Sequence, residues 1–159
     1  MRLKILSILL VTALPGVAAA QDGVSVERGL HISIIGGCHD CHTEGYNEAN
    51  GEIDPGKALK GVPLGWRGPW GTSYAKNLRL VAAPLSEDDF VGFMKSLQTL
   101  PPMPWYNVRA MEENDLRSLY QYIKSLGQPG EAMPEALPPD VEPMTPYIVI
   151  APPLMPKAN

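Results

Sequence analysis

The sequence of 159 residues has few aromatic side chains, few cysteines and few charges. Phe, Trp and Tyr make up 7% of the chain, so aromatic rings alone cannot supply its apolar core. Two Cys residues exclude a disulfide-rich scaffold. A charged fraction of 19% and a net charge of −4 indicate a globular chain and give no sign of nucleic-acid binding. We therefore expect a single domain with additional terminal segments.

No apolar run in the sequence is long enough to span a membrane. The best candidate, residues 5–14, ends at a Pro-Gly pair after ten residues, whereas a spanning helix needs about 20. It follows two basic residues and precedes the small residues that end at Ala20, as in a secretory signal peptide. We expect residues 1–20 to be cleaved near Ala20, leaving an exported, periplasmic chain without stable membrane insertion. An uncleaved anchor is the alternative.

Proline is abundant at the other end of the chain. Nine prolines lie within residues 128–159, a composition that excludes a long helix and predicts an extended tail. One apolar run, residues 147–150, interrupts this tail. Two interpretations remain open for it: a strap that folds back over the domain, or a strand that adds to a partner protein.

Three segments of the expected domain, residues 21–127, have helical periodicity. The first covers residues 25–35, the second runs from the N-cap Ser86 to Leu100, and the third covers residues 113–126. No segment alternates as a strand would, and the stretch between the first and second helices is rich in Gly and Pro. A loop of this length needs something to organise it.

The two cysteines supply that organising feature. They lie in Cys38-His39-Asp40-Cys41-His42, a C-x-x-C-H motif that is the attachment signature of c-type haem. On one helical turn both thiols can bond to one porphyrin edge, and the following imidazole can reach the iron. The competing interpretations are weaker. A zinc site needs four ligands, a thioredoxin-like pair needs a βαβ context, and a structural disulfide leaves the adjacent histidine unexplained.

Methionine is a common sixth ligand of haem iron, and Met103 is the best candidate. It lies among three prolines that stiffen an extended backbone, which suits an oriented ligand. Met94 fits the apolar stripe of a helix and Met111 a helix start, and the remaining candidates lie in the tail: Met133, Met144 and Met155. An iron without Met103 would have an open sixth position, as in a haem enzyme or a ligand sensor.

The Gly/Pro-rich loop carries side chains that could flank a haem. Four have polar tips suited to a propionate, although the two indoles could simply cover the ring: Trp66, Arg67, Trp70 and Tyr74. Residues 55–86 also contain five basic residues and no acidic one. This suggests a positive docking face for an acidic partner, with scattered solvated charges as the alternative.

Residues 25–127 resemble a class I cytochrome c domain. More narrowly, they resemble the haem domains in cytochrome subunits of periplasmic alcohol, aldehyde and sugar-acid dehydrogenases. The similarity lies in residues 27–30, the C-x-x-C-H motif, residues 86–90, Pro102-Met103-Pro104 and residues 120–126. It implies an all-α fold whose first and last helices cross, with Gly29 letting Tyr122 approach, around one covalently bound haem c. It also implies His42 and Met103 as axial ligands.

The resemblance implies a function as well. Such a protein passes single electrons from a periplasmic dehydrogenase toward an acceptor cytochrome or an oxidase and transforms no substrate itself. Two positions depart from the family pattern. Glu112 stands where the last helix usually opens with Ser or Thr. A lysine replaces the proline whose carbonyl usually orients the axial histidine, so we expect Pro55 or Pro63 to take that role.

Overall fold

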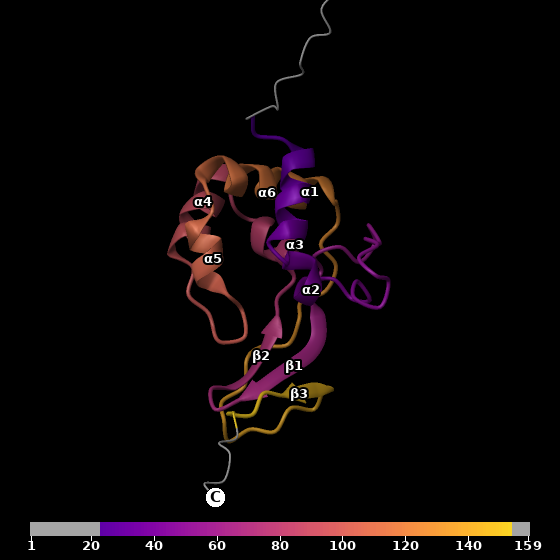
Figure 1. Cartoon of the computed structure of the whole chain (residues 1–159), viewed down its shortest axis with the longest axis vertical. Helices are drawn as coiled ribbons and strands as arrows, with labels where there is room; N and C mark the ends of the chain where they lie inside the picture. Colours follow the sequence, from indigo (N-terminus) through magenta and orange to yellow (C-terminus); the bar gives the residue numbers. More distant parts are fainter. Residues whose placement is uncertain (1–22, 154–159) are drawn as a thin grey trace, which may run out of the picture.

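The computed structural model describes residues 23–153, with most helices at one end of the molecule and a small sheet at the other (Figure 1). The helices are α1 (Val26–Ile35), α2 (Cys38–His42), α3 (Leu78–Ala82), α4 (Glu87–Ser96), α5 (Trp105–Ala110) and α6 (Glu113–Ser125). The strands are β1 (Val62–Gly68), β2 (Gly71–Ala75) and β3 (Tyr147–Val149). The expected signal peptide, its cleavage site and Met155 lie outside the described residues. Within residues 23–153, no helix has the length and apolarity needed to cross a bilayer.

The three predicted helices are confirmed as α1, α4 and α6. The hydroxyls of Ser25 and Ser86 cap α1 and α4, each accepting a backbone N–H bond of 3.1 Å. Helix α4 ends at Ser96, earlier than expected. At the start of α6, Glu112 makes no side-chain cap, in keeping with its departure from the family pattern. Gly127 follows α6 with a φ of +77°, as the C′ position requires.

Helices α1 and α6 cross at Gly29, as the resemblance implied. A Cβ on Gly29 would lie 2.0 Å from the Ser118 carbonyl oxygen and 2.7 Å from the Tyr122 Cβ, so only glycine permits this approach. Buried side chains of α4 and α6 form most of the core beside the crossing: Phe90, Val91, Met94, Leu116, Leu119, Tyr122 and Ile123.

The expectation of an all-α fold is wrong in one respect, because the long loop and the tail form a three-stranded sheet. Strands β1 and β2 form an antiparallel hairpin in which Trp66 is paired with Ser73. Strand β3 lies parallel to β1 on its other side, in the order β2-β1-β3. Gly and Pro interrupt any alternation of polar and apolar residues within β1, and its partner strand β3 is distant in sequence. No local pattern in the sequence therefore predicts the sheet.

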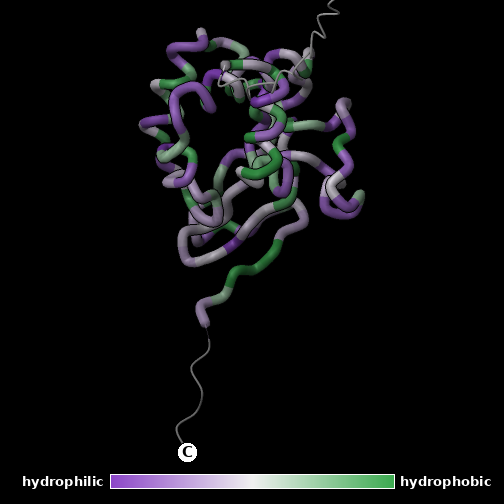
Figure 2. Tube along the Cα trace, turned by 45° about the horizontal axis from the view of Figure 1, so that its top comes forward, coloured by the Kyte–Doolittle hydropathy of each residue, from purple (hydrophilic) through white to green (hydrophobic). Residues whose placement is uncertain are grey.

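The Pro-rich tail runs back along the domain, which is the course that the strap interpretation predicts. Thr72 of β2 and Leu137 exchange two backbone hydrogen bonds of 2.8 Å each. The Asn77 amide donates to the carbonyls of Pro129 and Glu131 at 2.8 and 2.9 Å. The apolar run that ends the strap is exposed throughout β3, and Figure 2 shows it as the green stretch leading to the C-terminal end.

Candidate haem site

An apolar cavity of about 310 Å³ is lined by residues from the helices and from the β1–β2 hairpin. Aliphatic, aromatic and thioether side chains of α3 to α6 and of the loop after α4 make up much of its lining: Leu78, Val81, Phe93, Met94, Leu97, Val108 and Leu119. Lys76 is the one residue with a permanent charge among the described residues that line it. A largely apolar ligand therefore suits this cavity.

Both cysteines line the cavity from the short helix α2. Gly37, with a φ of +68°, turns the chain from α1 into α2, a conformation that glycine adopts without strain. Burial raises the pKa of the Cys38 thiol to about 11 and also raises the pKa of Cys41. Both thiols are unpaired and uncharged at neutral pH, so the structure gives no support to a disulfide.

His42, also in α2, presents one ring nitrogen to the cavity and anchors the other. Its Nδ1 lies 2.7 Å from the Lys76 carbonyl oxygen, which can only accept, so Nδ1 carries the proton. The Nε2 lone pair is then free to bind a metal. Burial lowers the pKa of His42, which keeps the ring neutral. The expected acceptors Pro55 and Pro63 are wrong, because the carbonyl after β2 takes this role.

His39 faces away from the cavity and is fully buried, with 0% exposure. Its Nε2 lies 3.0 Å from Ser33 Oγ and its Nδ1 lies 2.8 Å from Thr43 Oγ1. Ser33 donates its own hydroxyl proton to the Leu30 carbonyl, so Nε2 of His39 carries the proton and Nδ1 accepts from Thr43. Within residues 23–153, no group of three or more His, Cys, Asp or Glu side chains is placed to hold a metal ion.

Met103, Trp66 and Tyr74 all contribute to the cavity lining. Met103 lies in the loop between α4 and α5 and also packs against the hydrophobic core. The Tyr74 hydroxyl is engaged elsewhere, because it forms a 2.8 Å hydrogen bond with Thr145 Oγ1 of the tail. The structure thus brings the two cysteines, one imidazole and three thioethers, those of Met94, Met103 and Met111, to a single cavity.

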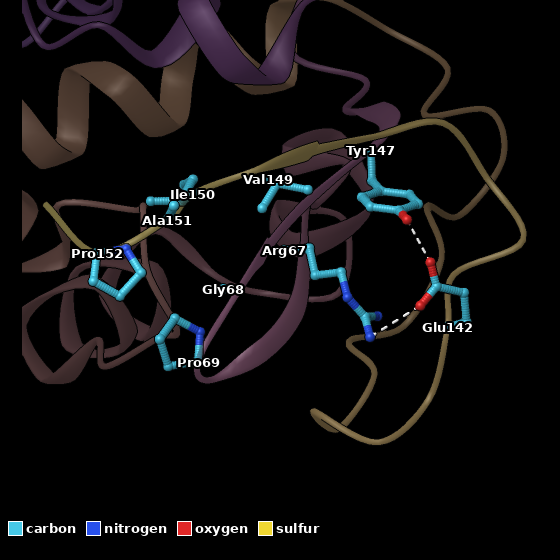
Figure 3. Close-up of a pocket in the computed structure, with 9 residues that line it drawn as sticks. All are labelled: Arg67, Gly68, Pro69, Glu142, Tyr147, Val149, Ile150, Ala151 and Pro152. Atoms are coloured by element: carbon cyan, nitrogen blue, oxygen red, sulfur yellow. Dashed lines mark hydrogen bonds and ion pairs between the residues drawn. The ribbon is translucent and has the colours of Figure 1, made fainter. Parts of the chain in front are cut away.

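Arg67 and Trp70 are not among the residues that line the cavity. Arg67 lies in a second, open pocket between β1 and the tail, where its guanidinium pairs with Glu142 at 3.0 Å (Figure 3). Tyr147 from β3 donates its hydroxyl to the same carboxylate. The Trp70 ring packs on Gly68, where a Cβ would come within 2.5 Å of it. The Trp70 indole N–H is buried and has no hydrogen-bond partner within the described residues, so the propionate role of this side chain stays a prediction.

The basic side chains behind the expected positive docking face are mostly paired or buried, and the docking face itself stays a prediction. Three of the five basic side chains in residues 55–86 form ion pairs, namely Lys57 with Glu44, Arg67 with Glu142, and Lys76 with Glu135. Arg79 is buried and donates to the carbonyls of Pro55, Ala58, Leu126 and Gln128. The tail supplies two of the carboxylates, so it neutralises charge that the linear sequence leaves unbalanced.

Three contributors to the site have no signal in the sequence. The Lys76 carbonyl orients His42, yet every residue has such a group. Ala136 brings the tail into the cavity wall, and Ser73 lines the cavity from β2. Only the three-dimensional course of the hairpin and the strap reveals them.

The residues present fit a covalently bound haem c. Two thiols at one part of an apolar cavity can form the thioether bonds, and an oriented neutral imidazole can bind iron. The cavity also explains the low aromatic content, because a porphyrin supplies the apolar mass that the side chains lack.

Comparisons with known proteins agree with this geometry. The family model described as Cytochrome c matches residues 26–127. Two curated relatives are each described as "Alcohol dehydrogenase (quinone), cytochrome c subunit", one from Gluconacetobacter polyoxogenes and one from Komagataeibacter europaeus. Each is 30% identical to this chain over 149 residues, which cover 80% of this chain and 29% of the relative. The chain therefore spans less than a third of the length of these relatives. No solved structure gives a significant match.

Proposed function

The chain belongs to the cytochrome c family and binds one haem c through Cys38 and Cys41, and we propose that it carries single electrons with His42 and Met103 as the axial iron ligands. The haem supplies the Fe(II)/Fe(III) couple. The chain supplies the covalent attachment, the oriented imidazole and a cavity that keeps water from the metal. In this proposal it transforms no substrate of its own.

One observation carries the proposed ligation: His42 and Met103 line the same cavity as the two cysteines, and Met103 does so from a loop. Met94 and Met111 also line it, but Met94 lies within α4 and Met111 caps the end of α5. The hydrogen bond to Lys76 leaves His42 Nε2 available, and Met103 comes from a different loop. A thioether ligand stabilises Fe(II) and raises the reduction potential, which suits a carrier that accepts electrons from a dehydrogenase.

The spectrum of the oxidised protein tests this ligation. A Met–Fe(III) bond gives a weak red absorption band, and we expect that band in the purified holoprotein. The variant Met103→Ala should lose the band. The matched control Met144→Ala should keep it, since the Met144 side chain in the tail is 100% exposed. A wild-type protein without the band, or a Met103→Ala variant that retains it, would contradict the proposal, and a missing band would favour a ligand sensor or haem enzyme.

The partners in the proposal follow from the relatives, whose descriptions name a quinone alcohol dehydrogenase. We propose a periplasmic dehydrogenase of this kind as donor and a cytochrome or an oxidase as acceptor. Stopped-flow mixing of the oxidised protein with a substrate-reduced dehydrogenase should show reduction of the haem.

The N-terminal sequence of protein taken from the periplasmic fraction should begin near Gln21. Failure of reduction, or an intact N-terminus, would contradict the corresponding part.

A further inference from the structure

Strand β2 contacts the segments that carry both proposed iron ligands. Immediately after β2, the Lys76 carbonyl accepts the Nδ1–H bond of His42 at 2.7 Å. Within β2, the Ser73 hydroxyl donates to the Pro101 carbonyl, two residues before Met103. A single short strand thus connects the histidine side of the cavity with the methionine side.

The Met103 loop has few groups by which it could be held. Pro101, Pro102 and Pro104 have no amide hydrogen, so the loop can be tethered mainly through its carbonyls. The carbonyls of Met103 and Pro104 accept only from nearby residues at the start of α5, at 2.9 and 3.0 Å. The bond from Ser73 differs, because it joins the loop to another part of the fold.

The strand that carries Ser73 is itself fixed from outside by the tail. Beside Ser73, Thr72 exchanges two 2.8 Å backbone bonds with Leu137, and Tyr74 bonds to Thr145 at 2.8 Å. Strand β1 holds the opposite edge and pairs Ser73 with Trp66, which lines the cavity as Ser73 does. Strand β2 is the edge of the sheet, but the tail bridges its outer side at Thr72, so Ser73 is held from both sides.

We propose that Ser73 is a positioning residue that holds the Met103 loop over the haem cavity. It acts through Pro101 and does not touch the iron. This inference rests on the proposed ligation by Met103. Without the Ser73 hydroxyl, the conformation in which Met103 reaches the iron should be less populated, although the fold around β2 stays intact.

Competition by imidazole, a small ligand that binds iron when Met103 leaves, measures that population. Loss of one net hydrogen bond should make the apparent imidazole affinity of oxidised Ser73→Ala about fivefold tighter than that of the wild type. Ser73→Thr keeps the hydroxyl and should restore the wild-type affinity. Ser96→Ala is the matched control, since its hydroxyl bonds only to carbonyls within α4. Thermal midpoints of all variants separate loosening of the loop from general destabilisation.

Each outcome of these measurements supports or overturns the positioning role of Ser73. Tighter imidazole binding in Ser73→Ala alone, with Ser73→Thr and Ser96→Ala like the wild type, supports the inference. Equal binding in Ser73→Ala and Ser96→Ala, while the wild type shows the red Met–Fe(III) band, overturns the role of Ser73 and leaves the ligation standing. A wild type without that band overturns the ligation and this inference with it.

Discussion

Gly29 of α1 lies directly against the backbone of Ser118 in α6, at a point where a Cβ would be 2.0 Å from the carbonyl oxygen. The two helices therefore meet at backbone distance. This crossing also brings the hydroxyls of Ser33 and Tyr122 to Nε2 of His39, which belongs to the attachment helix α2. The position of the haem attachment helix thus depends on the absence of a side chain at Gly29.

Gly29→Ala should destabilise the protein by about 3 kcal/mol, because the new methyl group meets backbone that cannot rotate away. Urea unfolding of the holoprotein measures this loss. The control is Gly92→Ala in α4, where nothing lies within 4 Å of the added Cβ. That change should stabilise the protein by about 0.5–1 kcal/mol through helix propensity. Similar effects of the two substitutions would contradict the close crossing.

Arg79 connects two segments of the chain through its buried guanidinium. It donates to the carbonyls of Pro55 and Ala58 in the loop and to those of Leu126 and Gln128 after α6. Arg79→Met keeps much of the volume but leaves those carbonyls without donors, so we expect a loss of about 3 kcal/mol in urea unfolding. Arg109→Met is the control, because the Arg109 guanidinium lies over the Trp105 ring. A loss for Arg79→Met no larger than for this control would show that water replaces the four bonds.

The features that could be predicted from the sequence are those with local signals. The hydroxyls of Ser25 and Ser86 begin helices because each bonds to an amide three residues later. Cys38, Cys41 and His42 likewise form their motif within one turn of the chain. A pattern of this kind is visible in the sequence because the interacting groups are neighbours.

The remaining features depend on contacts between distant residues. The charge of Arg67 suggested a propionate partner, yet Glu142 in the tail pairs with it. The orientation of His42 depends on a main-chain carbonyl, and because every residue type has one, the sequence does not indicate which carbonyl it is. Strand β1 contains Pro63 and Gly65, and its pairing with the distant β3 compensates for its poor strand composition.

His39 should make the stability of the protein depend on pH. Burial lowers its pKa from 6.5 to about 4. Between these pH values the unfolded chain therefore binds a proton that the folded chain does not bind. The contribution of neutral His39 is complete above about pH 6.5 and declines as the pH falls toward 4. In urea titrations across this range, His39→Gln should therefore show a shallower loss of stability than the wild type. Parallel curves for the two proteins would show that His39 does not titrate on unfolding.

The tail could act as a strap or as a strand that binds a partner protein. Truncation after residue 139 separates these two roles. This truncation removes the Pro146 carbonyl bonded to Gly65 at 2.9 Å, the Ile150 amide bonded to Arg67 at 2.7 Å, and the Thr145 hydroxyl bonded to Tyr74. A strap predicts a lower thermal midpoint and a loss of about 2 kcal/mol, because lost hydrogen bonds are partly offset by the entropy of the freed chain. Reduction by the dehydrogenase should continue at temperatures where the truncated chain is folded.

Val149→Ser provides the matched control for that truncation. The Val149 side chain is 65% exposed, and the substitution leaves every backbone bond of the strap in place. A strap predicts that this variant keeps the wild-type thermal midpoint and the wild-type rate of haem reduction. A partner strand predicts the opposite pattern, because the lost apolar contact would slow reduction in Val149→Ser and nearly abolish it in the truncated chain. Slowed reduction with unchanged thermal midpoints would therefore replace the strap with a docking strand.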